Sequence, residues 1–239
     1  MRKAVRALLF DFDGLLVDTE SAEYRAWCEL YEQYGHVLEP STWSLAVGTI
    51  GGFDPSAHLA SLGTPPTAEA LKAQKERVLE LCELEDFLPG VDALLDIANR
   101  RGLKTCIVSS STRAWIEGHL RSRSGLERFG AIVCADGDPA RAKPRPVLYL
   151  EALERLGVHA NEAIAFEDSP NGIAAAKAAG VFCIAVPNPV TAALNFDKAD
   201  CVLESLADFD LDAALSKEGE ERPPIRRALG INDPRGDVI

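Results

Sequence analysis

Several features that mark particular classes of protein are missing or scarce in this sequence of 239 residues. Basic residues are outnumbered, with 25 Lys and Arg against 37 Asp and Glu, and the formal net charge is -12. Because nucleic acids and anionic membranes bind cationic surfaces, this balance argues against both as general partners. The apolar runs are no longer than a strand, so we expect no membrane span and no membrane partner.

The cysteines also lack the pattern of a disulfide framework. Six cysteines are scattered along the chain, and no Cys-x-x-Cys pair occurs. Cys106, Cys134 and Cys183 lie inside apolar runs, where cysteine acts as a small hydrophobic residue. We therefore expect free thiols and a reducing, cytoplasmic location.

Short apolar segments rich in β-branched residues recur along the chain, and most of them are apolar almost throughout. They are residues 5–10, 104–108, 131–134, 163–166, 182–186 and 201–203. Such runs are typical of strands that are buried on both faces. Helical patterns separate them, such as 89–99, 146–156 and the alanine-rich segment that Ser169 and Pro170 open. This alternation predicts an α/β fold with a doubly wound, Rossmann-like parallel sheet.

The stretch between the first two strands is too long for an ordinary crossover. It has helical periodicity, with one apolar stripe from Tyr24 to Tyr34 and another from Leu71 to Leu84. We interpret it as an inserted α-helical cap domain at 18–87, with the α/β core at 1–17 and 88–215. Residues 216–239 have few apolar side chains and are predicted to form a loosely held tail.

Two aspartates follow the first predicted strand directly. Asp11 and Asp13 are two residues apart at the carboxyl end of that strand, where parallel sheets bind their ligands. Carboxylates packed so closely repel one another, so a divalent cation or a proton is expected between them. Taken alone, this pair is equally compatible with two solvated loop acids.

Polar residues also follow three later strands. Ser109 and Ser110 provide hydroxyl and backbone N–H groups that can hold a phosphate. Lys143 provides a cation, and Glu167 and Asp168 provide two further carboxylates. The acids suit Mg²⁺, and the lysine and serines suit phosphate oxygens.

Each of these residues has a plain structural alternative. Ser109 could cap the helix that contains Trp115, Lys143 could be a solvated loop lysine, and the two acids could interact with a helix dipole. Their joint occurrence at successive strand ends makes a shared site the better interpretation.

The order of these motifs resembles that of the haloacid dehalogenase superfamily of phosphotransferases. The motifs are Asp11-Phe12-Asp13-Gly14 with Asp18-Thr19-Glu20, then Ser109, then Lys143-Pro144, then Glu167-Asp168-Ser169-Pro170-Asn171-Gly172. The insertion after the first motif is similar to the small helical cap of the subgroup that contains beta-phosphoglucomutase and several small-molecule phosphatases.

The resemblance implies a role for each motif residue. Asp11 would be the nucleophile that forms an aspartyl-phosphate, and Asp13 the general acid and base. Mg²⁺ would bind Asp11, the backbone carbonyl of Asp13 and Asp168, with Glu167 as a ligand or close neighbour. Ser109, Ser110 and Lys143 would bind the transferring phosphoryl group.

The subgroup contains both phosphatases and mutases. In beta-phosphoglucomutase a histidine of the first cap helix contributes to sugar binding, and Glu23 stands at that place here. The mutase's arginine-containing specificity loop is also missing, since residues 47–55 are uncharged until Asp54. These departures favour a Mg²⁺-dependent phosphatase of small phosphate monoesters, such as sugar phosphates, over a phosphosugar mutase.

Glu23 is the candidate specificity residue, facing a substrate with hydroxyl groups or positive charge, although it could equally be a surface acid of its helix. A third possibility is a non-catalytic sensor that binds a phosphate ligand, which the intact acids disfavour. The expected partner is a small phosphate ester, and the chain is expected to be a monomer or a homodimer.

Overall fold

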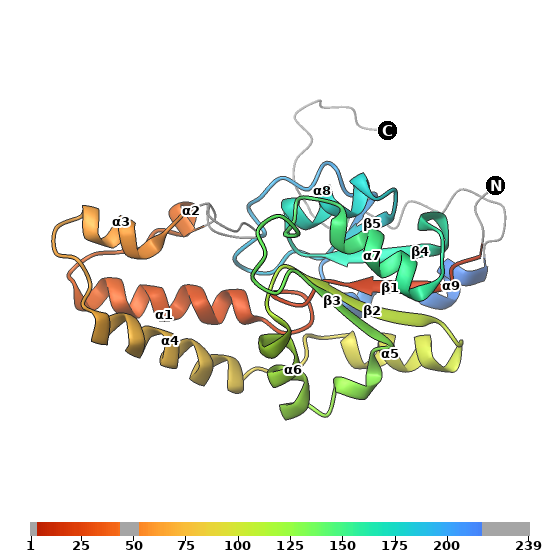
Figure 1. Ribbon diagram of the computed structural model, residues 1–239, viewed down its shortest axis with the longest axis horizontal. Coiled ribbons are helices and arrows are strands. Elements are labelled where there is room, and N and C mark those ends of the chain that lie inside the picture. Colours follow the sequence, from red (N-terminus) through yellow and green to blue (C-terminus); the bar gives the residue numbers. More distant parts are fainter. Residues whose placement is uncertain (1–3, 44–52, 217–239) are drawn as a thin grey trace, which may run out of the picture.

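The computed structural model describes residues 4–43 and 53–216 (Figure 1). In this part of the chain six parallel strands form one sheet in the order β3-β2-β1-β4-β5-β6. The strands are β1 (Ala7–Phe10), β2 (Lys104–Ser109), β3 (Ala131–Cys134), β4 (Ala163–Glu167), β5 (Phe182–Ala185) and β6 (Cys201–Val202). The predicted doubly wound α/β fold is thus confirmed, and each strand lies within one residue or two of its expected position.

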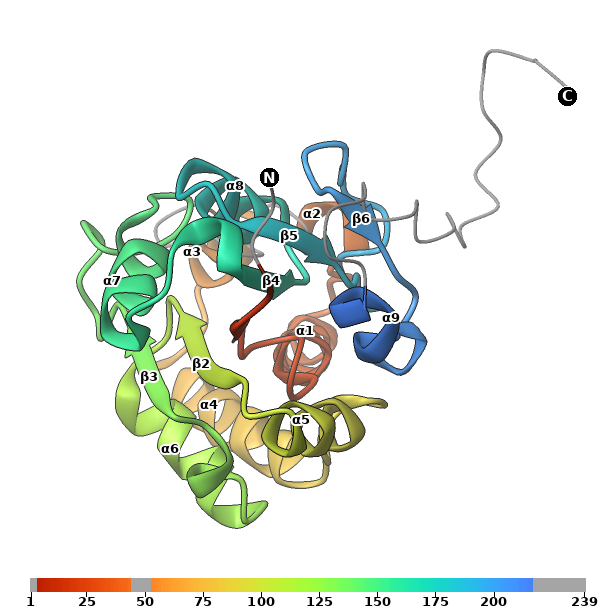
Figure 2. The same cartoon turned by 90° about the vertical axis from the view of Figure 1, so that its right-hand side faces the viewer.

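The sheet is covered on both faces, which explains why its strands are apolar throughout. On one face Leu8 and Phe10 pack against α5 (Val91–Arg100), α6 (Arg113–Ser122) and α9 (Leu211–Ser216). On the other face Ala7 and Leu9 pack against α7 (Val147–Leu156) and α8 (Pro170–Ala178). Figure 2 shows the two helical layers on either side of the strands.

Short elements complete the described chain outside the sheet and its two helical layers. They are the 3-10 turns η1 (Leu126–Arg128), η2 (Ala160–Glu162) and η3 (Leu206–Asp208). Between β1 and α5 the chain forms α1 (Thr19–Gln33), α2 (Pro40–Trp43), α3 (Pro55–Ser61) and α4 (Ala68–Glu83).

The four helices α1 to α4, here called the helical segment, lie beyond one end of the sheet (Figure 1). They bury a small apolar cluster of their own that includes Trp27, Tyr31 and Trp43. The apolar stripe expected over 24–34 is therefore confirmed, since its residues pack together in this cluster. The stripe expected over 71–84 is only partly correct, because Leu79 and Leu84 are exposed while Leu81 is buried.

Three further expectations meet different outcomes. All six cysteines lie in the described part of the chain and none forms a disulfide bond there, in agreement with the predicted thiols. Among the helices the structure describes, none combines the length and apolar character that a bilayer crossing needs. The tail predicted at 216–239 lies outside the described residues from 217 on, as does most of the loop 47–55, and the domain boundaries stay a prediction.

Candidate active site

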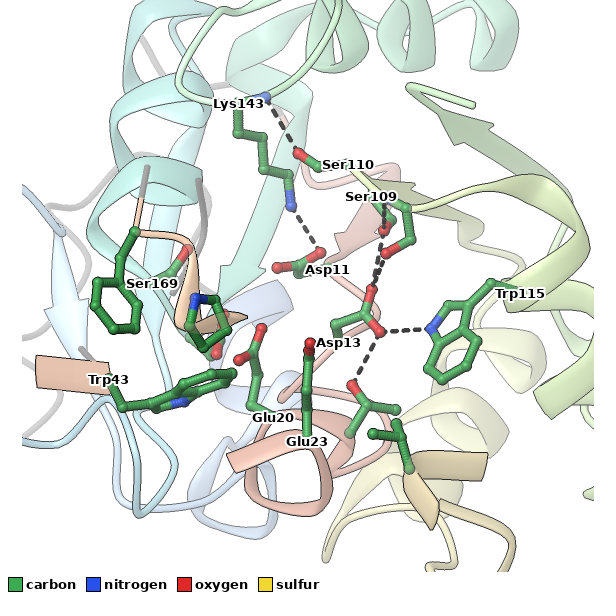
Figure 3. Close-up of a pocket in the computed structure, with 16 residues that line it drawn as sticks. Asp11, Asp13, Glu20, Glu23, Trp43, Ser109, Ser110, Trp115, Lys143 and Ser169 are labelled. Atoms are coloured by element: carbon green, nitrogen blue, oxygen red, sulfur yellow. Dashed lines mark hydrogen bonds and ion pairs between the residues drawn. The ribbon is translucent and has the colours of Figure 1, made fainter. Parts of the chain in front are cut away.

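Most of the sequence-predicted residues gather at the carboxyl ends of β1, β2 and β4, while Lys143 reaches the same place from the loop after β3 and Glu23 from α1 (Figure 3). They surround a cavity of about 320 Å³. Its lining residues are Asp11, Asp13, Thr19, Glu20, Glu23, Trp43, Phe53, Pro55, Val78, Ser109, Ser110, Ser111, Trp115, Lys143, Asp168 and Ser169. Glu167 is fully buried and does not line the cavity. This edge is also where the strand order changes direction, with β2 on one side of β1 and β4 on the other.

Lys143 joins the ends of two strands. Its Nζ lies 2.7 Å from Oδ1 of Asp11 and 2.7 Å from Oε1 of Glu167. Tyr149 of α7 also donates a hydrogen bond to Oε1 of Glu167. Burial alone would lower the pKa of Lys143, but the Asp11 and Glu167 carboxylates raise it above its ordinary value. The ammonium group is therefore a fixed, buried cation beside Asp11, and the solvated-lysine alternative is wrong.

Asp11, Glu167 and Asp168 form an acidic cluster that could hold a metal ion. Each offers one oxygen, and these three oxygens lie within 4.8 Å of one another. Oε2 of Glu167 is buried without a hydrogen-bond partner. Carboxylate oxygens in such an arrangement are ligands that Mg²⁺ prefers, so the residues present fit a divalent cation.

The raised pKa values of two acids in this cluster also indicate a site for a cation. Burial, and then the charge of Asp11, raise the pKa of Glu167 to about 8 against the opposing effect of Lys143. Burial and the same Asp11 charge raise the pKa of Asp168 well above its ordinary value. A divalent cation would offset this repulsion and return both acids to the ionised form.

The Asp13 side chain is not part of that cluster and is held by four donors instead. Thr19 Oγ1 and Trp115 Nε1 donate to its Oδ1 at 2.9 and 2.7 Å. The hydroxyls of Ser111 and Ser109 donate to its Oδ2 at 2.5 and 3.3 Å (Figure 3). Whether the Asp13 backbone carbonyl binds metal stays a prediction.

The serines at the end of β2 divide their contacts, with the Ser109 and Ser111 hydroxyls directed to Asp13 and the Ser110 hydroxyl to the Lys143 backbone. Besides its contact with Asp13, Ser109 Oγ accepts a hydrogen bond from the Ser111 backbone N–H at 3.0 Å, while Ser110 Oγ accepts one from the Lys143 backbone N–H at 3.2 Å. The helix cap that the sequence allowed for Ser109 belongs to Thr112, whose hydroxyl accepts from the Trp115 N–H. The Ser109 hydroxyl therefore does not cap α6, and it lines the cavity beside Asp13.

Two acids of α1 face the aspartates across the cavity. Glu23 extends into it and Glu20 lies beside it (Figure 3), and whether Glu23 selects the substrate stays a prediction. Burial raises the pKa of Glu20 well above its ordinary value, and repulsion from Glu23 and Asp13 adds to this. Burial and repulsion from Asp13 raise the pKa of Glu23 as well. This wall of the cavity suits hydroxyl groups or a positive charge.

Asn188 is a buried site residue that the sequence reasoning missed. Its Nδ2 donates to Oδ2 of Asp168 at 2.8 Å and to the Gly14 carbonyl at 3.2 Å, so it orients one of the clustered acids. Gly14 has a φ of +73°, and a Cβ there would lie 2.4 Å from Asn188 and 2.5 Å from Asp168. Asn188 follows β5, so the strand-end argument applied to that strand could have found it.

Comparison with known proteins places this site in a family. The haloacid dehalogenase-like hydrolase family matches residues 5–180. YhcW of Bacillus subtilis (strain 168), a protein named as a phosphatase, is 44% identical over 213 residues, which cover 88% of this chain and 96% of YhcW.

Many solved structures share the fold, including those of two proteins that were determined with bound ligands. CbbY from Rhodobacter sphaeroides, determined with phosphate and, as a mutant, with xylulose-1,5-bisphosphate, has a TM-score of 0.69 and 30% identity, covering 85% of this chain and 95% of that one. A HAD family hydrolase from Deinococcus radiodurans R1, with bound phosphate and sodium, has a TM-score of 0.74 and 27% identity, covering 89% of this chain and 96% of that one. The chain therefore belongs to the haloacid dehalogenase-like hydrolase family, and it is a phosphoric monoester hydrolase.

Proposed function

We propose that this enzyme is a Mg²⁺-dependent phosphatase that hydrolyses small phosphate monoesters, with sugar phosphates as the favoured class, through an aspartyl-phosphate on Asp11. The observation that carries the proposal is the position of Asp11 at the cavity, paired with the buried Lys143 and close to Asp13. Phosphoryl transfer depends mostly on in-line positioning of the reacting oxygens and on neutralised charge, and these residues would provide both.

In the first step a carboxylate oxygen of Asp11 would attack phosphorus. Lys143 Nζ and the Phe12 N–H both contact Oδ1, and no described residue donates to Oδ2, so Oδ2 is the better nucleophile. As the new P–O bond forms, the ester P–O bond breaks and the leaving oxygen takes the proton of Asp13.

In the second step water would attack the same phosphorus. Asp13, now ionised, takes a proton from that water, and the bond between Asp11 and phosphorus breaks to release phosphate. Ser109 and Ser110 would hold the phosphoryl oxygens, and Lys143 would offset their charge. Mg²⁺, held by Asp11, Asp168 and Glu167, would supply further charge neutralisation at the phosphoryl group.

The helical segment would act as a cap over the site and determine which ester enters. Its contribution to the cavity includes Glu20, Glu23, Trp43 and Phe53. Carboxylates that accept hydroxyl hydrogen bonds beside aromatic walls suit a polyol such as a sugar. We propose a reducing, cytoplasmic location, which would keep the six cysteines as thiols.

The test is a phosphate-release screen with sugar phosphates, phosphoglycolate, nucleotides and p-nitrophenyl phosphate. We expect release of phosphate from a few small esters. Asp11→Asn should lower kcat by about 10³-fold or more and abolish the aspartyl-phosphate, because an amide is a poor nucleophile. Asp208→Asn, a matched change at an exposed aspartate, should leave turnover intact. Wild-type turnover by Asp11→Asn would refute the assignment of the nucleophile.

Metal removal provides a separate test. Excess EDTA should abolish turnover, and added Mg²⁺ should restore it and raise the Tm of the free enzyme, since a ligand that binds only the folded state stabilises it. Activity that persists in EDTA would remove the metal from the mechanism.

β-Glucose 1-phosphate belongs in the same screen, because its conversion to glucose 6-phosphate without phosphate release would establish the mutase instead. No turnover of any ester would favour the sensor.

A further inference from the structure

Trp115 has a polar contact with a predicted catalytic residue that lies far from it in the sequence. It lies in the first turn of α6, lines the cavity and is half-buried. Its indole Nε1 donates a hydrogen bond to Oδ1 of Asp13 at 2.7 Å (Figure 3). The same oxygen accepts from Thr19 Oγ1 at 2.9 Å. Oδ1 of Asp13 is thus occupied by donors from two different helices.

The two oxygens of Asp13 have different chemical neighbours. An indole N–H donates and never accepts, so Trp115 keeps Oδ1 an acceptor even if the Thr19 hydroxyl, which also contacts Oδ1, reverses its direction. Oδ2 faces only the hydroxyls of Ser109 and Ser111 among the described residues, and a hydroxyl group can accept as well as donate. The proton of a protonated Asp13 therefore belongs on Oδ2, on the side of the phosphate-binding serines.

We propose that Trp115 is a positioning residue that holds Oδ1 of Asp13, so that the proton exchanged with the leaving oxygen and with water is carried on Oδ2. This inference rests on the proposed function, in which Asp13 is the general acid and base. A carboxyl group that could rotate freely would present the wrong oxygen to the leaving group for part of the time, which lowers the rate.

The indole ring is itself held by packing on two sides. It meets the His119 ring edge-on, with the ring centroids 4.3 Å apart and an interplanar angle of 75°. It also packs against the main apolar cluster of the core and against a smaller cluster that includes Leu81 and Cys82 of the helical segment. The direction of the N–H is therefore fixed by packing that does not involve Asp13.

The experiment compares two kinds of ester, because a purely structural role for Trp115 would affect both alike. p-Nitrophenolate leaves without being protonated, whereas the alkoxide of an alkyl phosphate needs a proton. Trp115→Phe retains an aromatic ring and removes the N–H. We expect it to lower kcat/KM for an alkyl phosphate such as glycerol phosphate by about 10-fold or more, and for p-nitrophenyl phosphate by less than about 3-fold.

Two threonine variants make the comparison sharper. Thr19→Val removes the other donor to Oδ1 and should change the ratio of the two kcat/KM values in the same direction. Thr112→Val is the matched control, since it removes the cap of α6 beside Trp115 but no donor to Asp13. It should lower the Tm and leave the ratio unchanged.

The outcomes separate the inference from the function on which it rests. A wild-type enzyme that hydrolyses neither ester overturns the proposed function and this inference with it. A wild-type enzyme that hydrolyses both, with a ratio that Trp115→Phe and Thr19→Val leave unchanged, overturns the inference alone. If circular dichroism shows that Trp115→Phe is unfolded, Thr19→Val provides the test instead. It removes the other donor to Oδ1 of Asp13, so an unchanged ratio in this variant would overturn the inference.

Discussion

The sheet edge and the helical segment contribute to the same cavity in different ways. At the sheet edge the groups that would act on phosphate are buried and paired, as with Lys143 between Asp11 and Glu167. In the helical segment Glu23 points into the cavity that the two regions enclose, where the walls partly desolvate its carboxylate although solvent in the cavity still reaches the side chain. The contrast supports the proposal that fixed, buried charges at the sheet edge would carry out the chemistry, whereas side chains on the separate helical wall would select the substrate.

The largest expected difference between the two regions is the difference between replacing a buried lysine at the sheet edge and replacing an exposed lysine in the helical segment. Lys143→Met leaves two buried carboxylates without their cation, which should cost about 3–5 kcal/mol of stability and abolish most turnover. Lys72→Met breaks an exposed pair with Glu76 at 3.7 Å and should change neither stability nor turnover appreciably. Urea denaturation and phosphate release measure both variants. Equal losses in the two would contradict the contrast between buried and exposed charge.

An intermediate effect is expected at the substrate-facing wall. Glu23→Gln keeps the shape of the side chain and removes its charge, so it should raise KM for the best sugar phosphate by about 3- to 10-fold. The KM of p-nitrophenyl phosphate should stay the same, because that ester has no hydroxyl groups to bind. Glu76→Gln, on the exposed face of α4, is the control. If both esters lose affinity equally, Glu23 does not select the substrate.

The smallest expected effect is a pH dependence within the core. Burial, and then the nearby Arg123, lower the pKa of His119 below its ordinary 6.5. Near this pH the folded state therefore binds fewer protons than the unfolded state. The neutral His119 ring stabilises the folded state fully above pH 6.5, and this stabilisation is lost as the pH falls from 6.5 toward the lowered pKa. His119→Phe should reduce the loss of stability between about pH 7.5 and about pH 5.5, with His36→Phe as control. Urea denaturation at both pH values tests this, and an unchanged pH dependence in His119→Phe would show that another group is responsible.

Most of the fold could be predicted because its signals are local. Continuous apolar runs such as 131–134 and 163–166 predict buried parallel strands, and Ser169 followed by Pro170 predicts the start of α8. The helical segment was harder, since its helices carry apolar residues on both buried and exposed faces. Leu84 fits the stripe of α4 by spacing, yet 79% of it is exposed, whereas Leu81 and Cys82 at the same end of the helix are buried against α1 and Trp115.

The candidate site was predictable to the extent that parallel strands bring their carboxyl ends together. That rule gathered Asp11, Ser109 and Asp168 correctly. It could not indicate which atoms would meet. Asn188 and Trp115 are ordinary residues in their own segments, and only tertiary contacts over 174 and 102 positions give them partners in the site.

The sequence by itself determined the alternation of strands and helices, the insertion after β1 and the set of acids, hydroxyls and one lysine at the strand ends. Those features follow from residue types and spacings along the chain. Only the tertiary structure decided that Asp13 turns away from the acidic cluster toward Trp115 and Thr19, while Lys143 bridges Asp11 and Glu167. The direction of a side chain depends on neighbours from distant segments, and a linear pattern does not contain them.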